Sequence, residues 1–206
     1  MTEYDYIIIG GGASGLLLAD ALGSDPFFKA KRIALFEKQP QKENDRTWCF
    51  WESGSGPFDA LIHKKWSVIR FRGPEFERTI PMAEYTYKML RGIDFYEEYY
   101  RRLRGYPNIE IRYEAVESLK ESETAAIVST ALGSYRAPRV LSSVMFQPPK
   151  SLMKPYPLLK QHFLGWFIRT EEAVFDPGAA TFMDFSVPQQ GNTRFMYILP
   201  FSPNEA

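Results

Sequence analysis

Residues 5–16, DYIIIGGGASGL, decide the fold of this chain. The β-branched run at the start predicts a buried strand over residues 5–10, and the apolar positions after it have helical spacing until Gly23 and Pro26 end the helix. Residues 32–37, RIALFE, predict a second buried strand that closes on an acid. Together these segments predict a strand–helix–strand unit with parallel strands.

The glycines between the first strand and the helix follow the spacing Gly10-x-Gly12-x-x-Gly15, the fingerprint of a dinucleotide-binding turn. Gly10 permits the tight turn, Gly12 lets the backbone approach a pyrophosphate, and Gly15 lets the helix pack on the strand. Glu37 closes the second strand, where an acid accepts hydrogen bonds from the ribose of adenosine and repels a 2′-phosphate. A glycine-rich turn without a ligand is the alternative, and the fingerprint alone does not separate FAD from NAD.

Composition excludes several other classes of protein. Among 206 residues, Lys and Arg (25) balance Asp and Glu (25), so no basic surface for nucleic acid is expected. One cysteine, Cys49, and two histidines make an intrachain disulfide impossible and a structural metal site unexpected. The apolar run over residues 6–21 is interrupted by glycines and lacks a basic start, so we do not expect it to be a signal peptide. The 16% aromatic content fits both a deep apolar pocket and an ordinary core.

The rest of the chain divides into weaker predicted elements. Asp94, with Glu97 three residues later, predicts a capped helix that Gly105 and Pro107 end. A proline-rich stretch at residues 146–157 predicts a boundary between subdomains. The remaining expectations are an irregular segment at 38–63, a hairpin of 66–71 with 76–80, a small sheet of 109–113, 125–130 and 135–144, and an antiparallel sheet of 164–170, 181–187 and 194–201.

Residues 44–51, NDRTWCFW, combine buried-type aromatic side chains with a charged pair. By residue chemistry alone, this pattern favours a capped loop with Trp48 and Trp51 as core anchors. However, residues 36–38 (FEK) followed by this block resemble the N-terminal signature of bacterial-type lycopene β-cyclases. Further segments resemble the same family in order along the chain: Tyr87, Arg91, Gly92, Asp94 and Phe95, then 161–166 (QHFLGW), 175–177 (FDP), 183–185 (MDF) and 197–201 (YILPF).

The resemblance implies an α/β fold of the FAD-dependent hydroxylase type, in which a Rossmann-type FAD-binding domain joins an antiparallel-sheet substrate domain. We expect the FAD-binding part at 1–62 and 85–147, and an incomplete substrate-domain sheet at 63–84 and 148–206. The implied reaction is the non-redox cyclisation of the ψ-ends of lycopene to β-rings, giving γ-carotene and then β-carotene. The implied cofactor is reduced FAD, maintained by NADPH, in a cytoplasmic enzyme peripheral to the inner membrane.

The residues expected to hold the cofactor are Gly10, Gly12, Ala13, Ser14, Gly15, Glu37, Lys38 and Arg46. In the family, the carboxylate of the acid–base step follows shortly after the segment that ends here at Ala206, so Glu205 does not inherit that role. The C-terminal part of the family pattern is absent, and the chain alone is expected to lack cyclase activity and to bind FAD weakly. Two alternatives stay open: a flavin-dependent oxidoreductase of the same fold, such as a hydroxylase or isoprenoid reductase, and a non-catalytic flavin- or carotenoid-binding fragment. The oligomeric state is unknown.

Overall fold

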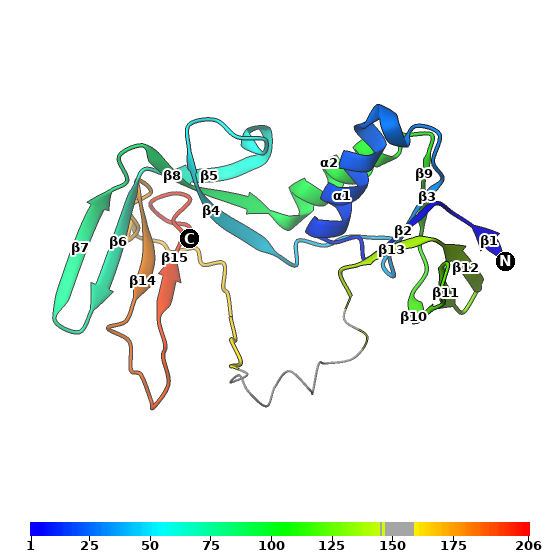
Figure 1. Cartoon of the computed structure of the whole chain (residues 1–206). Helices are drawn as coiled ribbons and strands as arrows, with labels where there is room; N and C mark the ends of the chain where they lie inside the picture. Colours follow the sequence, from blue (N-terminus) through cyan, green and yellow to red (C-terminus); the bar gives the residue numbers. More distant parts are fainter. Residues whose placement is uncertain (145, 147–158) are drawn as a thin grey trace. The chain divides into compact units, whose positions relative to one another are not determined.

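The computed structural model describes residues 1–144, 146 and 159–206, so the predicted boundary at 146–157 lies, apart from Phe146, outside the described residues. The chain divides into two compact units (Figure 1). Unit 1 comprises Met1–Asp45 and Gly92–Leu159, and unit 2 comprises Arg46–Arg91 and Lys160–Ala206. Residues 46–62 and 85–91, which we expected in the FAD-binding part, thus group with unit 2.

Unit 1 is built on a parallel sheet in the order β13-β2-β3-β9. Its strands and the two helices that accompany them are β2 (Tyr6–Ile9), α1 (Ala13–Ser24), β3 (Ile33–Phe36), α2 (Gly92–Leu103), β9 (Ile109–Arg112) and β13 (Arg139–Ser142). The predicted strand–helix–strand unit is confirmed, with Ile9 of β2 paired in parallel register with Phe36 of β3. From β2 the chain adds β3 and β9 on one side and later returns to place β13 on the other side. The strand order therefore reverses between β2 and β13, which is where α/β sheets bind ligands.

A second sheet of unit 1, in the order β1-β12-β11-β10, packs on one face of the parallel sheet. It consists of β1 (Thr2–Glu3), β10 (Val116–Glu121), β11 (Ala126–Thr130) and β12 (Gly133–Ala137). Ile7 and Phe36 form a core with Val128 and Tyr135 of this sheet, while in Figure 1 α1 and α2 lie on the opposite side. Alternate side chains of the strands thus serve two apolar layers.

Contacts between the two helices hold them together along their sides. Asp20 of α1 forms an ion pair with Arg102 of α2 at 2.6 Å and accepts a hydrogen bond from the hydroxyl of Tyr106 at 3.0 Å. The absence of a side chain at Gly23 makes room for the ring of Tyr106, because a Cβ atom there would lie 2.3 Å from it. A short 3₁₀ helix, η1 (Pro26–Phe28), follows α1.

Two sequence-based expectations for unit 1 were wrong. Residues 109–113, 125–130 and 135–144 do not form one small sheet, because β9 and β13 join the parallel sheet while β11 and β12 pair with each other. Asp94 is not the helix cap, since α2 already begins at Gly92. The N–H of Ile93 instead donates to the side chain of Asn44 at 3.4 Å.

Unit 2 contains an antiparallel sheet in the order β4-β8-β5 and a mixed sheet in the order β15-β14-β6-β7. Trp66, Tyr87, Met89 and Ala180 are buried together as its core. Its elements are β4 (Thr47–Ser53), η2 (Asp59–Leu61), β5 (Ile62–Trp66), β6 (Val68–Gly73), β7 (Phe76–Pro81), β8 (Tyr85–Arg91), β14 (Ala179–Asp184) and β15 (Met196–Ile198).

The predicted hairpin of residues 66–71 and 76–80 is confirmed as β6 and β7, but other expectations for unit 2 were wrong. Residues 38–63 are not uniformly irregular, because β4 pairs with β8 along its whole length. The sheet expected to be antiparallel is mixed, since β14 runs parallel to β6. Residues 164–170 make only an isolated bridge between Arg169 and Glu205 rather than a strand.

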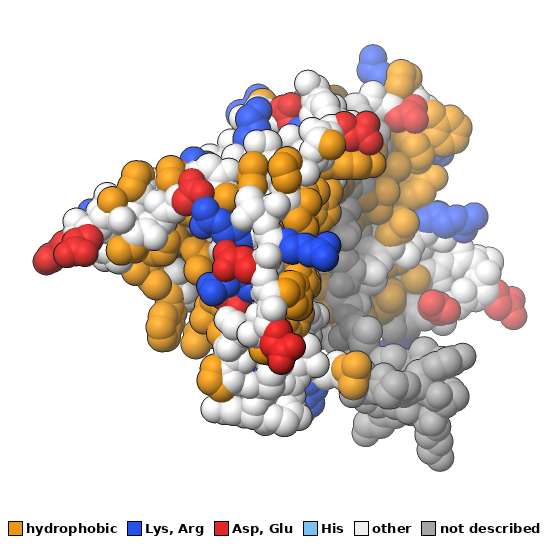
Figure 2. Space-filling model, turned by 90° about the vertical axis from the view of Figure 1, so that its left-hand side faces the viewer, with side chains coloured by type: hydrophobic (Ala, Val, Ile, Leu, Met, Phe, Trp, Pro, Cys, Tyr) orange, Lys and Arg blue, Asp and Glu red, His pale blue; other side chains and the backbone are white. Residues whose placement is uncertain are grey.

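Hydrophobic side chains gather on the face of unit 2 that carries β6 and β7, among charged groups of both signs (Figure 2). Phe76 and Ile80 of β7 are exposed large hydrophobic residues. Arg72 of β6 forms ion pairs with Glu77 at 3.2 Å and with Asp184 at 3.4 Å. Among the described residues, no helix has the length and apolar character needed to cross a membrane.

Candidate cofactor site

The glycine turn lies at the carboxyl end of β2, where the strand order reverses. Gly10 has a φ of +103°, a left-handed conformation that favours glycine, and its N–H donates to the carbonyl of Phe36 at 2.8 Å. A Cβ atom at Gly15 would lie 1.9 Å from the carbonyl oxygen of Gly10. These two glycines therefore allow α1 to start directly against the turn, as the sequence predicts.

Gly12 is different, because a Cβ atom there would meet no described atom within 4 Å. It is the N-cap of α1 and has an extended backbone, and no side chain caps the helix within the described part of the chain. Leu16 is the first helical residue whose N–H bonds back, to the carbonyl of Gly12 at 2.9 Å. The amides of Ala13, Ser14 and Gly15 thus form the open, positively polarised end of a helix, which suits a phosphate group.

The carboxylate of Glu37 turns toward this glycine turn. Its Oε2 atom accepts a hydrogen bond from the N–H of Gly11 at 2.8 Å, and Oε1 accepts one from the N–H of Gln39 at 2.9 Å. Lys42 forms an ion pair with Oε2 at 2.9 Å. Burial alone would raise the pKa of Glu37, but the hydrogen bonds from Lys42, Gln39 and Gly11 outweigh it and lower the pKa. Glu37 is therefore an anion held at the turn.

The sequence reasoning missed three residues that shape this site. Gly11 has no room for a side chain, since a Cβ atom would lie 2.3 Å from the hydroxyl of Tyr100 and 2.9 Å from Glu37. Tyr100 is buried on α2, and its hydroxyl donates to the carbonyl of Gly11 at 3.4 Å. Lys42 lies 5.2 Å from the ring centroid of Tyr96. Only Gly11 carried a signal in the sequence, as the middle member of the glycine run.

Two further predicted site residues are exposed. Lys38 follows Glu37 and is exposed to solvent. Arg46 is exposed at the start of unit 2, immediately before β4. Their contact with a cofactor stays a prediction, whereas Gly10, Gly12, Gly15 and Glu37 lie together at the carboxyl ends of β2 and β3.

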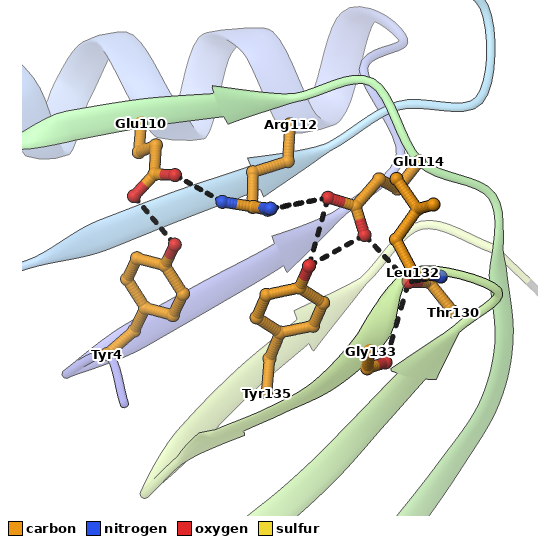
Figure 3. A network of polar contacts seen from close by, with 8 residues as sticks. All are labelled: Tyr4, Glu110, Arg112, Glu114, Thr130, Leu132, Gly133 and Tyr135. Carbon is orange, nitrogen blue, oxygen red and sulfur yellow. Dashed lines mark hydrogen bonds and ion pairs between the residues drawn. The ribbon is translucent and has the colours of Figure 1, made fainter. Parts of the chain in front are cut away.

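A polar network that is buried around Glu114 supports the neighbouring strand β9 (Figure 3). Glu114 accepts hydrogen bonds from Thr130 at 2.6 Å and from Tyr135 at 2.8 Å, and it pairs with Arg112 at 2.7 Å. Arg112 also pairs with Glu110, which accepts from the hydroxyl of Tyr4 at 2.6 Å. Burial raises the pKa of Tyr4 to about 12, and Glu110 adds to the effect. The network joins the end of β9 to β11 and β12, and so fixes the backbone beside Glu37.

The chain is similar in fold to solved structures of larger enzymes. A geranylgeranyl bacteriochlorophyll reductase-like protein from Thermoplasma acidophilum has a TM-score of 0.60 at 15% identity, covering 100% of this chain and 55% of that one. The flavin-dependent brominase Bmp2 has a TM-score of 0.55 at 16% identity, covering 99% of this chain and 54% of that one. The p-nitrophenol 4-monooxygenase PnpA from Pseudomonas putida DLL-E4 has a TM-score of 0.55 at 19% identity, covering 69% of this chain and 41% of that one.

These likenesses confirm the predicted α/β fold of Rossmann type, and this chain spans about half the length of the structures it resembles. No curated protein matches the sequence. A family model described as "Lycopene cyclase protein" matches residues 5–206, nearly the whole chain. The resemblance seen in the sequence motifs is thereby confirmed, and the chain belongs to the lycopene cyclase family.

Proposed function

We propose that this chain holds the adenosine diphosphate part of FAD and belongs to an enzyme that cyclises the ψ-ends of lycopene to β-rings. The observation that carries the cofactor assignment is the open end of α1 beside the carboxylate of Glu37. The family match supports the cyclase activity. The products would be γ-carotene and then β-carotene, with no net redox change.

Different residues at the turn would bind different parts of the cofactor. The amides of Ala13, Ser14 and Gly15 would receive the pyrophosphate, and Gly12 would leave it room to approach the backbone. Glu37 would accept hydrogen bonds from the ribose hydroxyls after giving up part of its contact with Lys42. Its anionic state at neutral pH suits an acceptor. When bound in its reduced form, maintained by NADPH, FAD supplies negative charge beside a cationic substrate.

Unit 2 carries aromatic rings suited to an apolar polyene. Trp51 stacks on Tyr87 with ring centroids 4.3 Å apart and meets Phe182 edge-on at 5.2 Å. Phe182 in turn contacts the ring of Tyr197 at 5.8 Å. Trp51 is partly exposed, so the group has an accessible edge. Aromatic faces attract carbocations and exclude water that would quench them, as a protonation-initiated cyclisation requires.

The substrate is an apolar polyene that dissolves in lipid, so we also propose peripheral contact with the inner membrane from its cytoplasmic side. The exposed hydrophobic residues of β7, Phe76 and Ile80, suit such contact. The residue that donates the proton is not assigned within residues 1–206.

An assay of the full gene product separates cyclisation from the oxidoreductase alternative, which the likeness of the fold to a monooxygenase and a reductase-like protein makes relevant. Lycopene in lipid vesicles is supplied with FAD and NADPH, and the carotenoids, NADPH and oxygen are all measured. We expect γ-carotene and β-carotene without oxygen uptake and without stoichiometric loss of NADPH. A hydroxylated or hydrogenated product with matching consumption of NADPH would replace the cyclase proposal with the oxidoreductase one.

A further inference from the structure

The carboxyl ends of β2, β3 and β9 lie side by side in register. Ile9 pairs with Phe36, and Phe36 pairs with Arg112, so each strand ends at the same level of the sheet. The N–H of Glu37 donates to the carbonyl of Arg112 at 2.9 Å, which extends this alignment one residue further. The first residues past the three strands are therefore Gly10, Glu37 and Tyr113, in that spatial order.

This order matches the order of groups in an adenosine diphosphate. Neighbouring strands lie about 4.8 Å apart, so consecutive positions in the row are separated by roughly the size of one sugar ring. The glycine turn after β2 suits the pyrophosphate, and Glu37 after β3 suits the ribose. The next covalently attached group is the adenine ring, and the next position in the row is Tyr113.

The ring of Tyr113 is available at this edge. Tyr113 is 43% exposed, and its ring centroid lies 6.4 Å from that of Tyr100 at an interplanar angle of 36°. Tyr100 itself reaches the glycine turn through the carbonyl of Gly11. A partly exposed aromatic ring is thus placed on the same side of the sheet as the turn.

The backbone that carries Tyr113 is held firmly. Its two neighbours, Arg112 and Glu114, pair with each other at 2.7 Å and bond into the buried network shown in Figure 3. The ring of Tyr135 lies under Arg112, 4.7 Å from its guanidinium carbon. Because side chains of an extended chain alternate in direction, fixing residues 112 and 114 on one side directs Tyr113 to the other. The network therefore acts as a support for this ring.

We propose that Tyr113 stacks against the adenine ring of the bound nucleotide and selects adenine dinucleotides over the mononucleotide FMN. The inference rests on the proposed function in that it assumes the glycine turn and Glu37 hold the pyrophosphate and ribose. It adds a binding residue directly after a third strand, β9, and predicts that this residue recognises only the adenine part.

The test compares the wild-type chain with Tyr113→Leu, which keeps apolar packing against Tyr100 but removes the aromatic face, and with Tyr113→Phe, which keeps it. Tyr85→Leu serves as a control, because Tyr85 is also an exposed tyrosine but lies in unit 2. Binding of FAD, ADP and FMN is measured by flavin fluorescence and calorimetry up to millimolar concentrations, and thermal unfolding checks each fold.

We expect Tyr113→Leu to weaken FAD and ADP binding about 10-fold, as the loss of one base–aromatic stack does elsewhere. Tyr113→Phe and Tyr85→Leu should match the wild type, and no variant should alter the weaker binding of FMN. If the wild type binds FAD and ADP but Tyr113→Leu binds them equally well, the stacking role of Tyr113 is wrong while the cofactor site stands. If the folded wild type binds neither FAD nor ADP, the proposed cofactor site fails and this inference fails with it.

Discussion

The Oε2 atom of Glu37 accepts a hydrogen bond from the backbone N–H of Gly11 at 2.8 Å, linking the end of the second parallel strand to the glycine turn after the first. The contact places a buried carboxylate next to the helix end that would receive a pyrophosphate. A cofactor bound here would meet an acceptor at the ribose and amide donors at the phosphates. Both parts are aligned by the register of β2 and β3.

Replacing Glu37 by Gln should weaken FAD binding by about 10-fold or more, because hydrogen bonds to a charged acceptor contribute about 1.5–3 kcal/mol. The amide keeps the size of the side chain but loses the charge and one acceptor. Binding is measured by quenching of flavin fluorescence. Glu98→Gln is the control, since Glu98 pairs with Arg101 on the outer side of α2. Equal affinities of Glu37→Gln and wild type would contradict a ribose contact.

Replacement by alanine should affect cofactor binding at Gly12 and stability of the fold at Gly15. A Cβ atom at Gly12 meets no described atom within 4 Å, so Gly12→Ala should lower the free energy of unfolding by at most about 1 kcal/mol, as expected for an N-cap change, while blocking the pyrophosphate. At Gly15 a Cβ atom would lie 1.9 Å from a backbone oxygen, so Gly15→Ala should destabilise the fold by about 1–3 kcal/mol.

Urea unfolding and FAD titration of both variants test this pair. The prediction fails if Gly12→Ala binds FAD as well as the wild type does, or if Gly15→Ala is as stable as the wild type.

The sequence predicted β2, α1 and β3 because each depends on a local pattern, an apolar run or a helical spacing interrupted by glycine. It did not predict that β9 and β13 join the same sheet, since that choice depends on pairing between residues far apart in the chain. The strand β4 was missed because its apolar residues are consecutive at 48–51 and do not alternate with polar ones. Lys42 and Tyr113 were missed because no motif surrounds them in the sequence. Their roles depend on side-chain contacts that exist only in the folded chain.

The candidate site likewise contains residues that a local motif predicts and residues that depend on contacts between distant parts of the chain. Gly10, Gly12, Gly15 and Glu37 were predictable because the turn imposes both their identity and their spacing. The network around Glu114 was not, because its partners come from β9, β11 and β12, and no short motif spans them. Its members are ordinary charged and hydroxyl residues whose role appears only when the strands are assembled.

Replacing Glu114 by Gln should lower the free energy of unfolding by about 1–3 kcal/mol at neutral pH, because it weakens a buried acceptor of several hydrogen bonds. Burial would raise the pKa of Glu114, but hydrogen bonds from Thr130, Tyr135 and Arg112 lower it below its ordinary value of 4.5. A carboxyl group whose pKa is lower in the folded state contributes its stability above the unfolded value and loses it as pH falls through the folded value.

The difference in stability between wild type and Glu114→Gln should therefore be constant above about pH 5 and shrink as the pH falls below 4.5. Urea unfolding at a series of pH values measures it. Glu117→Gln, an exposed change on β10, should show no such convergence. A difference that stays constant down to pH 3 would show that the charge of Glu114 does not act through this network.

Lys88 is a buried cation in unit 2, and its replacement by Met should loosen the segment between β4 and β5. The ammonium group donates to Asp59, to Glu52 at 2.7 Å and to the carbonyl of Gly54 at 3.0 Å. The hydrogen bonds to Asp59 and Glu52 raise the pKa of Lys88, so it stays charged. Met fills similar volume but leaves two carboxylates without their shared counter-ion.

We expect a lower Tm for Lys88→Met than for Lys65→Met, an exposed change on the adjoining strand, and faster proteolysis within residues 54–61. If the two variants melt at the same temperature and are cleaved at the same rate, Lys88 does not hold this segment in place.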